Sequence, residues 1–95
     1  IGDMLETETE NSSFHKDIGT FINSLKNIDE VITVGDNSEK IYNEVRCSNM
    51  HFKKVEESIN TIIDIINNSN EETAILIKAS LGMRFNMIIE AINNI

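Results

Sequence analysis

Apolar residues recur every three or four positions along most of this chain, and no proline interrupts them. Proline is the strongest helix breaker, so its absence permits long helices throughout. Alternating steps of three and four residues are typical of a helix with one narrow apolar seam. The pattern therefore predicts an all-α fold. The first seam consists of Phe14, Ile18, Phe21, Leu25, Ile28 and Ile32.

Three helices are expected, at about residues 13–34, 38–68 and 70–94. Gly35 suits a helix C-terminus, and Ser38 is a good N-cap. The VITV stretch at 31–34 has strand propensity, but it is too short to outweigh the helical phase. The apolar register slips by one residue at Gly35, so either the helix ends there or a continuous coil is locally distorted. The second seam consists of Ile41, Val45, Ser48, Phe52, Val55, Ile59, Ile62 and Ile66.

Residues 64–73 read DIINNSNEET and allow two interpretations. Ser69 and Glu72 have the spacing of a capping box, which would end one helix and begin the next. Alternatively, a long coiled-coil helix continues through the stretch. The apolar face expected beyond it consists of Ala74, Ile77, Leu81, Phe85, Ile88, Ile92 and Ile95.

Charge and length narrow the possible functions. A chain of 95 residues is enough for one small domain, here expected at 13–95, with residues 1–12 as an acidic flexible tail. The net charge of −8 argues against nucleic-acid binding. No apolar run approaches the ~18 residues that span a bilayer, so this chain is not expected to insert into a membrane. The single cysteine, Cys47, cannot form an internal disulfide, which favours a cytoplasmic location.

A family resemblance adds a functional expectation. Residues 55–73, VEESINTIIDIINNSNEET, resemble the approach to the hairpin tip in the cytoplasmic signalling domain of bacterial methyl-accepting chemotaxis receptors. The likeness covers about residues 52–95, and GMRFNMIIEAINNI at 82–95 resembles the returning arm of that hairpin. The family's E-A-A-R-A-G-E tip block is absent, so the tip is shortened.

The resemblance implies a long antiparallel helical hairpin that pairs in a homodimer to form a four-helix coiled-coil bundle. It also implies contacts with a histidine kinase or its coupling protein. The implied partner-contact tip consists of Glu72, Thr73, Leu76, Ala79 and Ser80. The implied dimer seam consists of Phe52, Val55, Ile59, Ile62 and Ile66.

Two other functions remain open. His51 is followed by Lys54 three residues on, which is the spacing of histidine phosphotransfer domains. In such a domain His51 would accept the phosphate and the lysine would neutralise it. The third hypothesis is a helical adaptor or chaperone whose heptads arose independently.

No catalytic, cofactor-binding or metal-ligating set is visible in the sequence. His15 has no His or Cys nearby in the sequence to complete a metal site. The sequence thus predicts a non-enzymatic signal-transduction or interaction module that needs no cofactor. An elongated dimer would favour the receptor-like hairpin, and a compact monomer would favour a three-helix bundle.

Overall fold

A parallel β-sheet lies at the centre of the fold, with helices on both of its faces. The computed structural model describes residues 1–4 and 13–95. The predicted all-α fold with a long antiparallel hairpin is therefore wrong. The elements are α1 (Ser13–Asn23), β1 (Val31–Val34), α2 (Glu39–Glu44), β2 (Asn49–Phe52), α3 (Val55–Asn68), the 3₁₀ turn η2 (Leu81–Met83) and α4 (Asn86–Asn93).

The sheet is wider than its two regular strands. β1 and β2 run parallel, with Val34 opposite Phe52. On the other edge of β1, Gly2 forms a parallel bridge with Val34. Beyond residues 1–3 lies the extended segment 78–80, because the Gly2 N–H donates to the Lys78 carbonyl at 2.8 Å. The order across the sheet is therefore 49–52, 31–34, 1–3 and 78–80.

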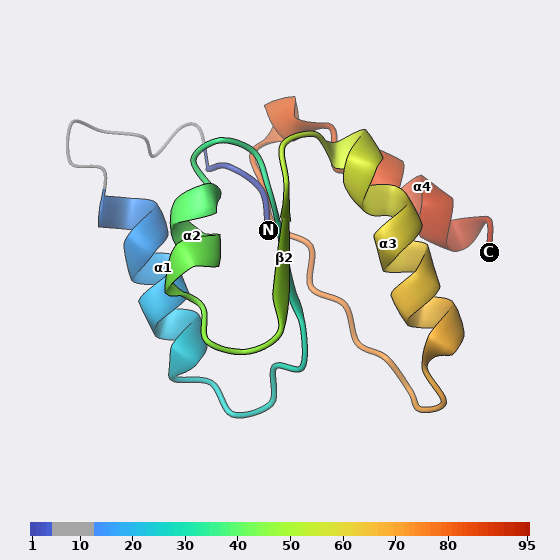
Figure 1. Cartoon of the computed structure of the whole chain (residues 1–95). Helices are drawn as coiled ribbons and strands as arrows, with labels where there is room; N and C mark the ends of the chain where they lie inside the picture. Colours follow the sequence, from blue (N-terminus) through green and yellow to red (C-terminus); the bar gives the residue numbers. More distant parts are fainter. Residues whose placement is uncertain (5–12) are drawn as a thin grey trace.

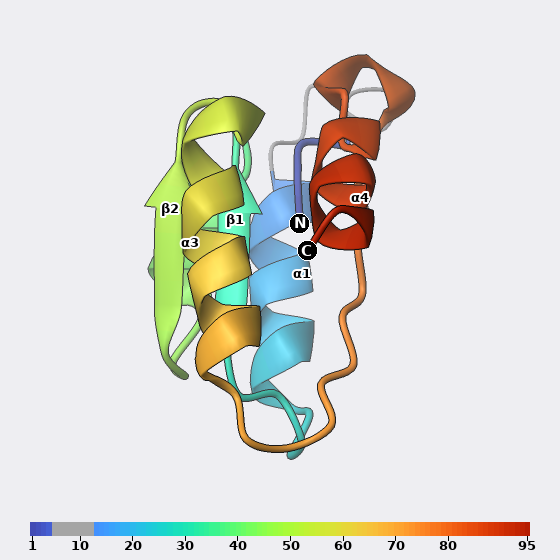
Figure 2. The ribbon, with the colours of Figure 1, turned by 90° about the vertical axis from the view of Figure 1, so that its right-hand side faces the viewer.

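The helices form two layers, one on each face of the sheet (Figure 1). α1 and α2 lie on one face, and α3 and α4 lie on the other (Figure 2). Right-handed crossovers explain this division. The chain moves in one direction across the sheet up to β2 and then returns to the far edge, so the crossover places α3 on the opposite face. α4 follows segment 78–80 and packs beside α3 on that face (Figure 2).

Two apolar cores follow from this arrangement, because side chains alternate between the two faces of a strand. Val31 faces α1 and α2, and Val34 faces α3 and α4. The first core contains Ile22, Val31, Ile41 and Val45. The second core contains Val34, Val55, Phe85 and Ile88, with half-buried neighbours that include Ile32, Phe52, Ile59 and Ile62.

The helix expected at 13–34 ends at Asn23. The VITV stretch instead forms β1, because its β-branched side chains fit a pleated, packed surface better than a helix. Phe21 and Leu25 of the predicted seam are 64% and 43% exposed, so the seam does not define a buried face. Gly35 does end an element, but that element is β1.

The helices expected at 38–68 and 70–94 are also wrong in extent. Residues 38–68 contain two helices separated by β2, and residues 69–80 contain no helix. Ser69 follows the last residue of α3, so a helix does end there. No helix begins at 70: the Ser69 hydroxyl donates to the Glu71 carbonyl at 3.0 Å and forms a turn. Among the described residues, no helix is long and apolar enough to cross a bilayer.

Part of the expected acidic tail belongs to the sheet. Gly2 bridges Val34, and Asp3 is buried. The tail prediction is therefore corrected for residues 1–4, while residues 5–12 lie outside the described part of the chain. The sequence signal was hidden because the apolar start is short and acidic residues follow it closely.

In the 95-residue chain with a free amine at Ile1, stability is expected to depend on pH. The amine donates to the Ile32 carbonyl at 2.7 Å, and burial lowers its pKa from 8.0 to about 6. The unfolded chain therefore binds a proton more readily, and stability falls as the pH drops from about 8 through 6. We expect the 95-residue chain with a free amine at Ile1 to lose about 2 kcal/mol of unfolding free energy over this range.

The measurement is urea unfolding at several pH values, for the free chain and for the Nα-acetylated chain. Acetylation removes the charge but keeps an N–H, so the difference between the two profiles isolates the contribution of the amine. Parallel profiles would contradict the prediction.

Candidate functional site

An open cleft lies at the carboxyl end of the parallel strands, between the start of α3 and the loop after η2. Its volume is about 430 Å³. In open α/β sheets, ligands bind in the crevice outside the carboxyl ends of the strands. The cleft has the position of such a site. Its lining residues are Lys53, Lys54, Val55, Glu56, Gly82, Met83 and Arg84.

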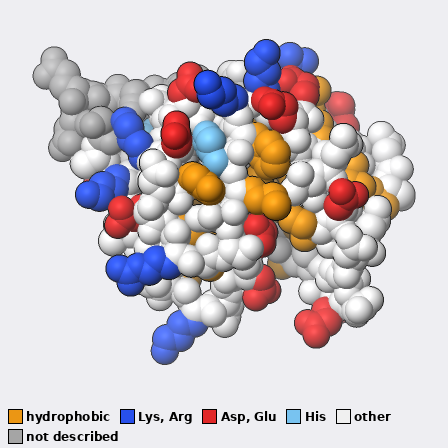
Figure 3. Space-filling model, in the orientation of Figure 1, with side chains coloured by type: hydrophobic (Ala, Val, Ile, Leu, Met, Phe, Trp, Pro, Cys, Tyr) orange, Lys and Arg blue, Asp and Glu red, His pale blue; other side chains and the backbone are white. Residues whose placement is uncertain are grey.

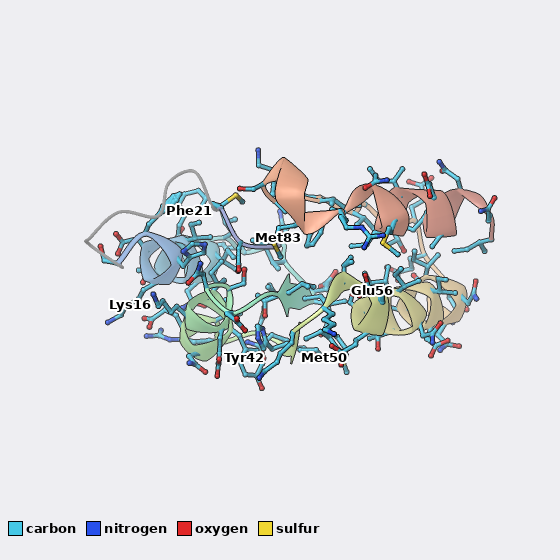
Figure 4. All side chains as sticks on the ribbon, turned by 90° about the horizontal axis from the view of Figure 1, so that it is seen from above. Lys16, Phe21, Tyr42, Met50, Glu56 and Met83 are labelled. Atoms are coloured by element: carbon cyan, nitrogen blue, oxygen red, sulfur yellow. The ribbon has the colours of Figure 1, made fainter. Side chains whose placement is uncertain are left out.

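The lining residues come from the junctions that follow the two outer segments of the sheet. Lys53 and Lys54 join β2 to α3. Gly82, Met83 and Arg84 lie in the connection between segment 78–80 and α4. In the view from above, Glu56 lies at the start of α3 and Met83 near the middle of the molecule (Figure 4). Val55 is buried in the second core and anchors this edge. The cleft is thus built on the sheet and both helices of one layer.

Backbone geometry orients both sides of the cleft. The Lys54 N–H donates to the Glu57 carboxylate at 3.1 Å, which caps α3. Arg84 has φ 58°, the only positive φ of a non-glycine residue in the described ranges. Such a backbone costs about 1–3 kcal/mol and is often found at functional sites. The turn at Arg84 leads directly into α4, so the N-termini of α3 and α4 both border the cleft.

The cleft is positively charged although the chain is acidic. Three of the eight Lys and Arg residues line it, together with one carboxylate, so its formal charge is 3 − 1 = +2. Figure 3 shows basic and acidic side chains close together at the top of the molecule, around the start of α3. The Arg84 Nη1 lies 3.9 Å from the Glu56 Oε1, and the two side chains are 68% and 48% exposed. The basic groups therefore remain accessible to an anion.

Asp3 fixes the adjoining turns. Its buried Oδ1 accepts the Ser38 N–H at 2.7 Å and the Ser38 hydroxyl at 2.8 Å. Its backbone carbonyl accepts the Ser80 N–H at 3.0 Å. One residue thus joins segment 1–3, the β1–α2 turn and the segment that leads into η2. The carboxylate has a structural role next to the cleft rather than a place in its lining.

The predicted tip residues do not form a helical tip. Glu72, Thr73 and Leu76 are exposed in the connection between α3 and segment 78–80. Ala79 packs against the second core, and Ser80 is buried. The structure therefore spreads this set over a loop and the edge of the sheet.

The predicted dimer seam is divided between a strand and a helix. Phe52, Val55, Ile59 and Ile62 all pack in or against the second core inside one chain. Ile66 is half-buried near the end of α3. Much of the apolar surface assigned to a dimer is thus used within the fold.

His51 lies on β2 rather than on a helix. Its Nδ1 is 2.7 Å from the Thr33 hydroxyl, and its ring packs against Tyr42 with centroids 5.6 Å apart. Residues 51 and 54 are not on one helix face, because His51 is in β2 and Lys54 precedes α3. The pairing required for the phosphotransfer hypothesis is therefore not formed.

Sequence reasoning missed the basic cleft. The sequence pattern assigns no role to Lys53, pairs Lys54 only with His51, and places Arg84 inside a predicted helix. Recognising NMHF as a strand would have placed both lysines at a strand's carboxyl end. Within the described ranges, no group of three or more His, Cys, Asp or Glu side chains could hold a metal ion.

Comparisons with known proteins provide no family assignment. No protein-family model, curated protein or solved structure significantly matches the chain.

Proposed function

We propose that this chain is a ligand-binding α/β domain that holds the phosphate group of a small phosphorylated molecule in the cleft. The observation that carries the proposal is the gathering of Lys53, Lys54 and Arg84 at the carboxyl end of the parallel strands. Lysine offers a compact positive charge to phosphate, and arginine offers a planar set of donors. The N-terminus of α4 adds partial positive charge at the same edge, whereas the N-terminus of α3 is already capped by the Glu57 carboxylate.

Charge and size favour a phosphate monoester over other anions. A phosphate monoester carries about −1.5 to −2 charges at pH 7, close to the cleft's opposite charge, whereas a carboxylate carries only one. A volume near 430 Å³ is at the small end of ligand pockets, which range over roughly 300–1,000 Å³. The cleft is therefore large enough for a small phosphorylated molecule.

The receptor-like signalling role, the homodimer and the kinase or coupling-protein contacts stay predictions, as does a cytoplasmic, non-enzymatic role. Their proposed mechanism depends on a long hairpin, and residues 38–68 form separate elements instead. The phosphotransfer and adaptor hypotheses depend on extended helices in the same way. Phosphate binding, in contrast, requires only the basic cleft residues Lys53, Lys54 and Arg84, which the structure places together.

The test replaces both lysines by glutamine. We expect Lys53→Gln/Lys54→Gln to raise the Kd for glycerol 3-phosphate about tenfold, because each exposed charge contributes about 0.2–1 kcal/mol. Isothermal titration calorimetry at fixed ionic strength measures the change. Arg84→Gln removes one charge and should raise the Kd by about two- to fivefold.

The matched control is Lys16→Gln/Lys26→Gln, which removes the same charge from exposed positions outside the cleft. Lys16 is in α1, on the opposite side of the molecule from Glu56 (Figure 4). The control should leave the Kd within about twofold of the original. An equal loss of affinity in the two double variants would mean that binding depends only on the overall charge of the chain. That result would contradict binding of the phosphate in the cleft.

A further inference from the structure

Glu56 places a carboxylate among the basic residues of the proposed phosphate-binding cleft. Glu56 is in the first turn of α3, its side chain is 48% exposed, and it borders the cleft with the basic residues. Its neighbour Glu57 already caps α3 by accepting the Lys54 N–H. Glu56 is therefore not needed for that cap.

The contact between Glu56 and Arg84 leaves both groups able to bind a ligand. Their 3.9 Å separation is an ion-pair distance but is too long for a hydrogen bond. The carboxylate is an acceptor only, and the guanidinium has five N–H donors. A phosphate could therefore take donors from Arg84 while the carboxylate accepts a hydrogen bond from another part of the same ligand.

The charge of Glu56 also excludes some ligands. A cleft with cations alone would favour inorganic phosphate, pyrophosphate and other dense polyanions. A fixed negative charge beside the phosphate position repels a second anionic group. It favours a ligand whose second group is a hydrogen-bond donor.

We propose that Glu56 determines specificity, and that the ligand is a phosphate monoester with a hydroxyl group close to the phosphate, as in a phosphorylated polyol or sugar. This inference rests on the proposed phosphate binding. A hydroxyl is favoured over an ammonium group because an ammonium would lower the ligand's negative charge below that needed to balance the cleft. The ligand hydroxyl donates a hydrogen bond to the Glu56 carboxylate, and the three cations hold the phosphate.

The experiment compares three probes by isothermal titration calorimetry. Glycerol 3-phosphate has hydroxyls near its phosphate, propyl phosphate has the same carbon chain without them, and pyrophosphate has a second anionic group. We expect the unmodified chain to bind glycerol 3-phosphate at least about fivefold more tightly than propyl phosphate, because a hydrogen bond to a charged group favours the ligand that makes it. Pyrophosphate should bind more weakly than glycerol 3-phosphate.

Two variants test the role of the carboxylate. Glu56→Gln should raise the affinity for pyrophosphate about fivefold, because it removes a nearby negative charge. Glu56→Ala should make the affinities for glycerol 3-phosphate and propyl phosphate equal within about twofold, because no acceptor remains. The control is Glu39→Gln, which removes the same charge from the first turn of α2 and should change none of these ratios.

The outcomes separate this inference from the function on which it rests. If the unmodified chain binds propyl phosphate as tightly as glycerol 3-phosphate, the role of Glu56 is overturned while phosphate binding stands. Pyrophosphate affinity that Glu56→Gln leaves unchanged would also overturn it. If none of the three probes binds the unmodified chain, the proposed function itself fails.

Discussion

Asp3→Ala is expected to lower the free energy of unfolding by about 3–5 kcal/mol, because two buried hydrogen bonds to a carboxylate are lost together. Asp3 is 5% exposed, and its Oδ1 accepts both the backbone N–H and the hydroxyl of Ser38. The substitution leaves these donors without that acceptor in a place that water reaches poorly. Urea unfolding followed by circular dichroism measures the loss. Domains of this size have about 5–15 kcal/mol of stability, so much of it would be removed.

A graded set of variants distinguishes loss of the acceptor from loss of packing. Asp3→Asn keeps a side-chain oxygen and should cost less than Asp3→Ala. Ser38→Ala removes only the hydroxyl donor and should cost about 1–2 kcal/mol. Equal losses for Asp3→Asn and Asp3→Ala would show that the carboxylate charge, rather than an acceptor at that position, is required. A loss below 1 kcal/mol for Asp3→Ala would contradict the proposal that the Asp3 carboxylate stabilises the fold through its hydrogen bonds to Ser38.

The apolar spacing of the sequence predicted some buried residues correctly but assigned them to the wrong elements. Ile41, Val45 and Val55 are all buried, and all belong to one predicted seam. Ile41 and Val45 pack in the first core, whereas Val55 packs in the second, on the other face of the sheet. The steps of three and four residues cross β2, where a helical period has no physical meaning. Apolar residues from separate elements therefore follow the spacing of a continuous heptad repeat without forming one helix.

The sequence contains a short signal for the first strand but none for the second. Val31–Val34 is a run of β-branched residues, and Gly35 follows it directly. Asn49–Phe52 has no comparable propensity, and its strand depends on pairing with β1. Pairing between segments 18 residues apart is a tertiary effect that local sequence patterns do not contain. Recognition of the first strand was possible from the sequence, while the second required knowledge of its partner.

The cleft was hidden for the same reason. Lys53 and Arg84 are distant in sequence and meet only because β2 and segment 78–80 are parallel and end at one edge. An all-α interpretation places both residues on the outside of helices, where charges usually need no explanation. Placing the basic residues together therefore depended on the order of the strands, which the sequence pattern did not reveal.

Gly35→Ala is expected to lower the free energy of unfolding by about 2–4 kcal/mol. Gly35 has φ 111°, a backbone region that residues with a Cβ rarely adopt. A Cβ at this position would lie 2.6 Å from the Asp3 carboxylate atoms. The Gly35 N–H also donates to the Phe52 carbonyl at 2.9 Å, so the turn cannot move without disturbing the β1–β2 edge. Urea unfolding measures the loss.

The two substitutions should be coupled, because both act on the position of the Asp3 carboxylate. In the Asp3→Ala background the steric conflict is gone and only backbone strain remains, so Gly35→Ala should then cost about 1–2 kcal/mol. The double variant should therefore be more stable than the sum of the single losses predicts. Strict additivity would mean that the backbone conformation alone requires glycine, and that Asp3 is held independently of the turn. Coupling would establish that Gly35 and Asp3 form one unit, in which the glycine leaves room for the carboxylate that binds Ser38.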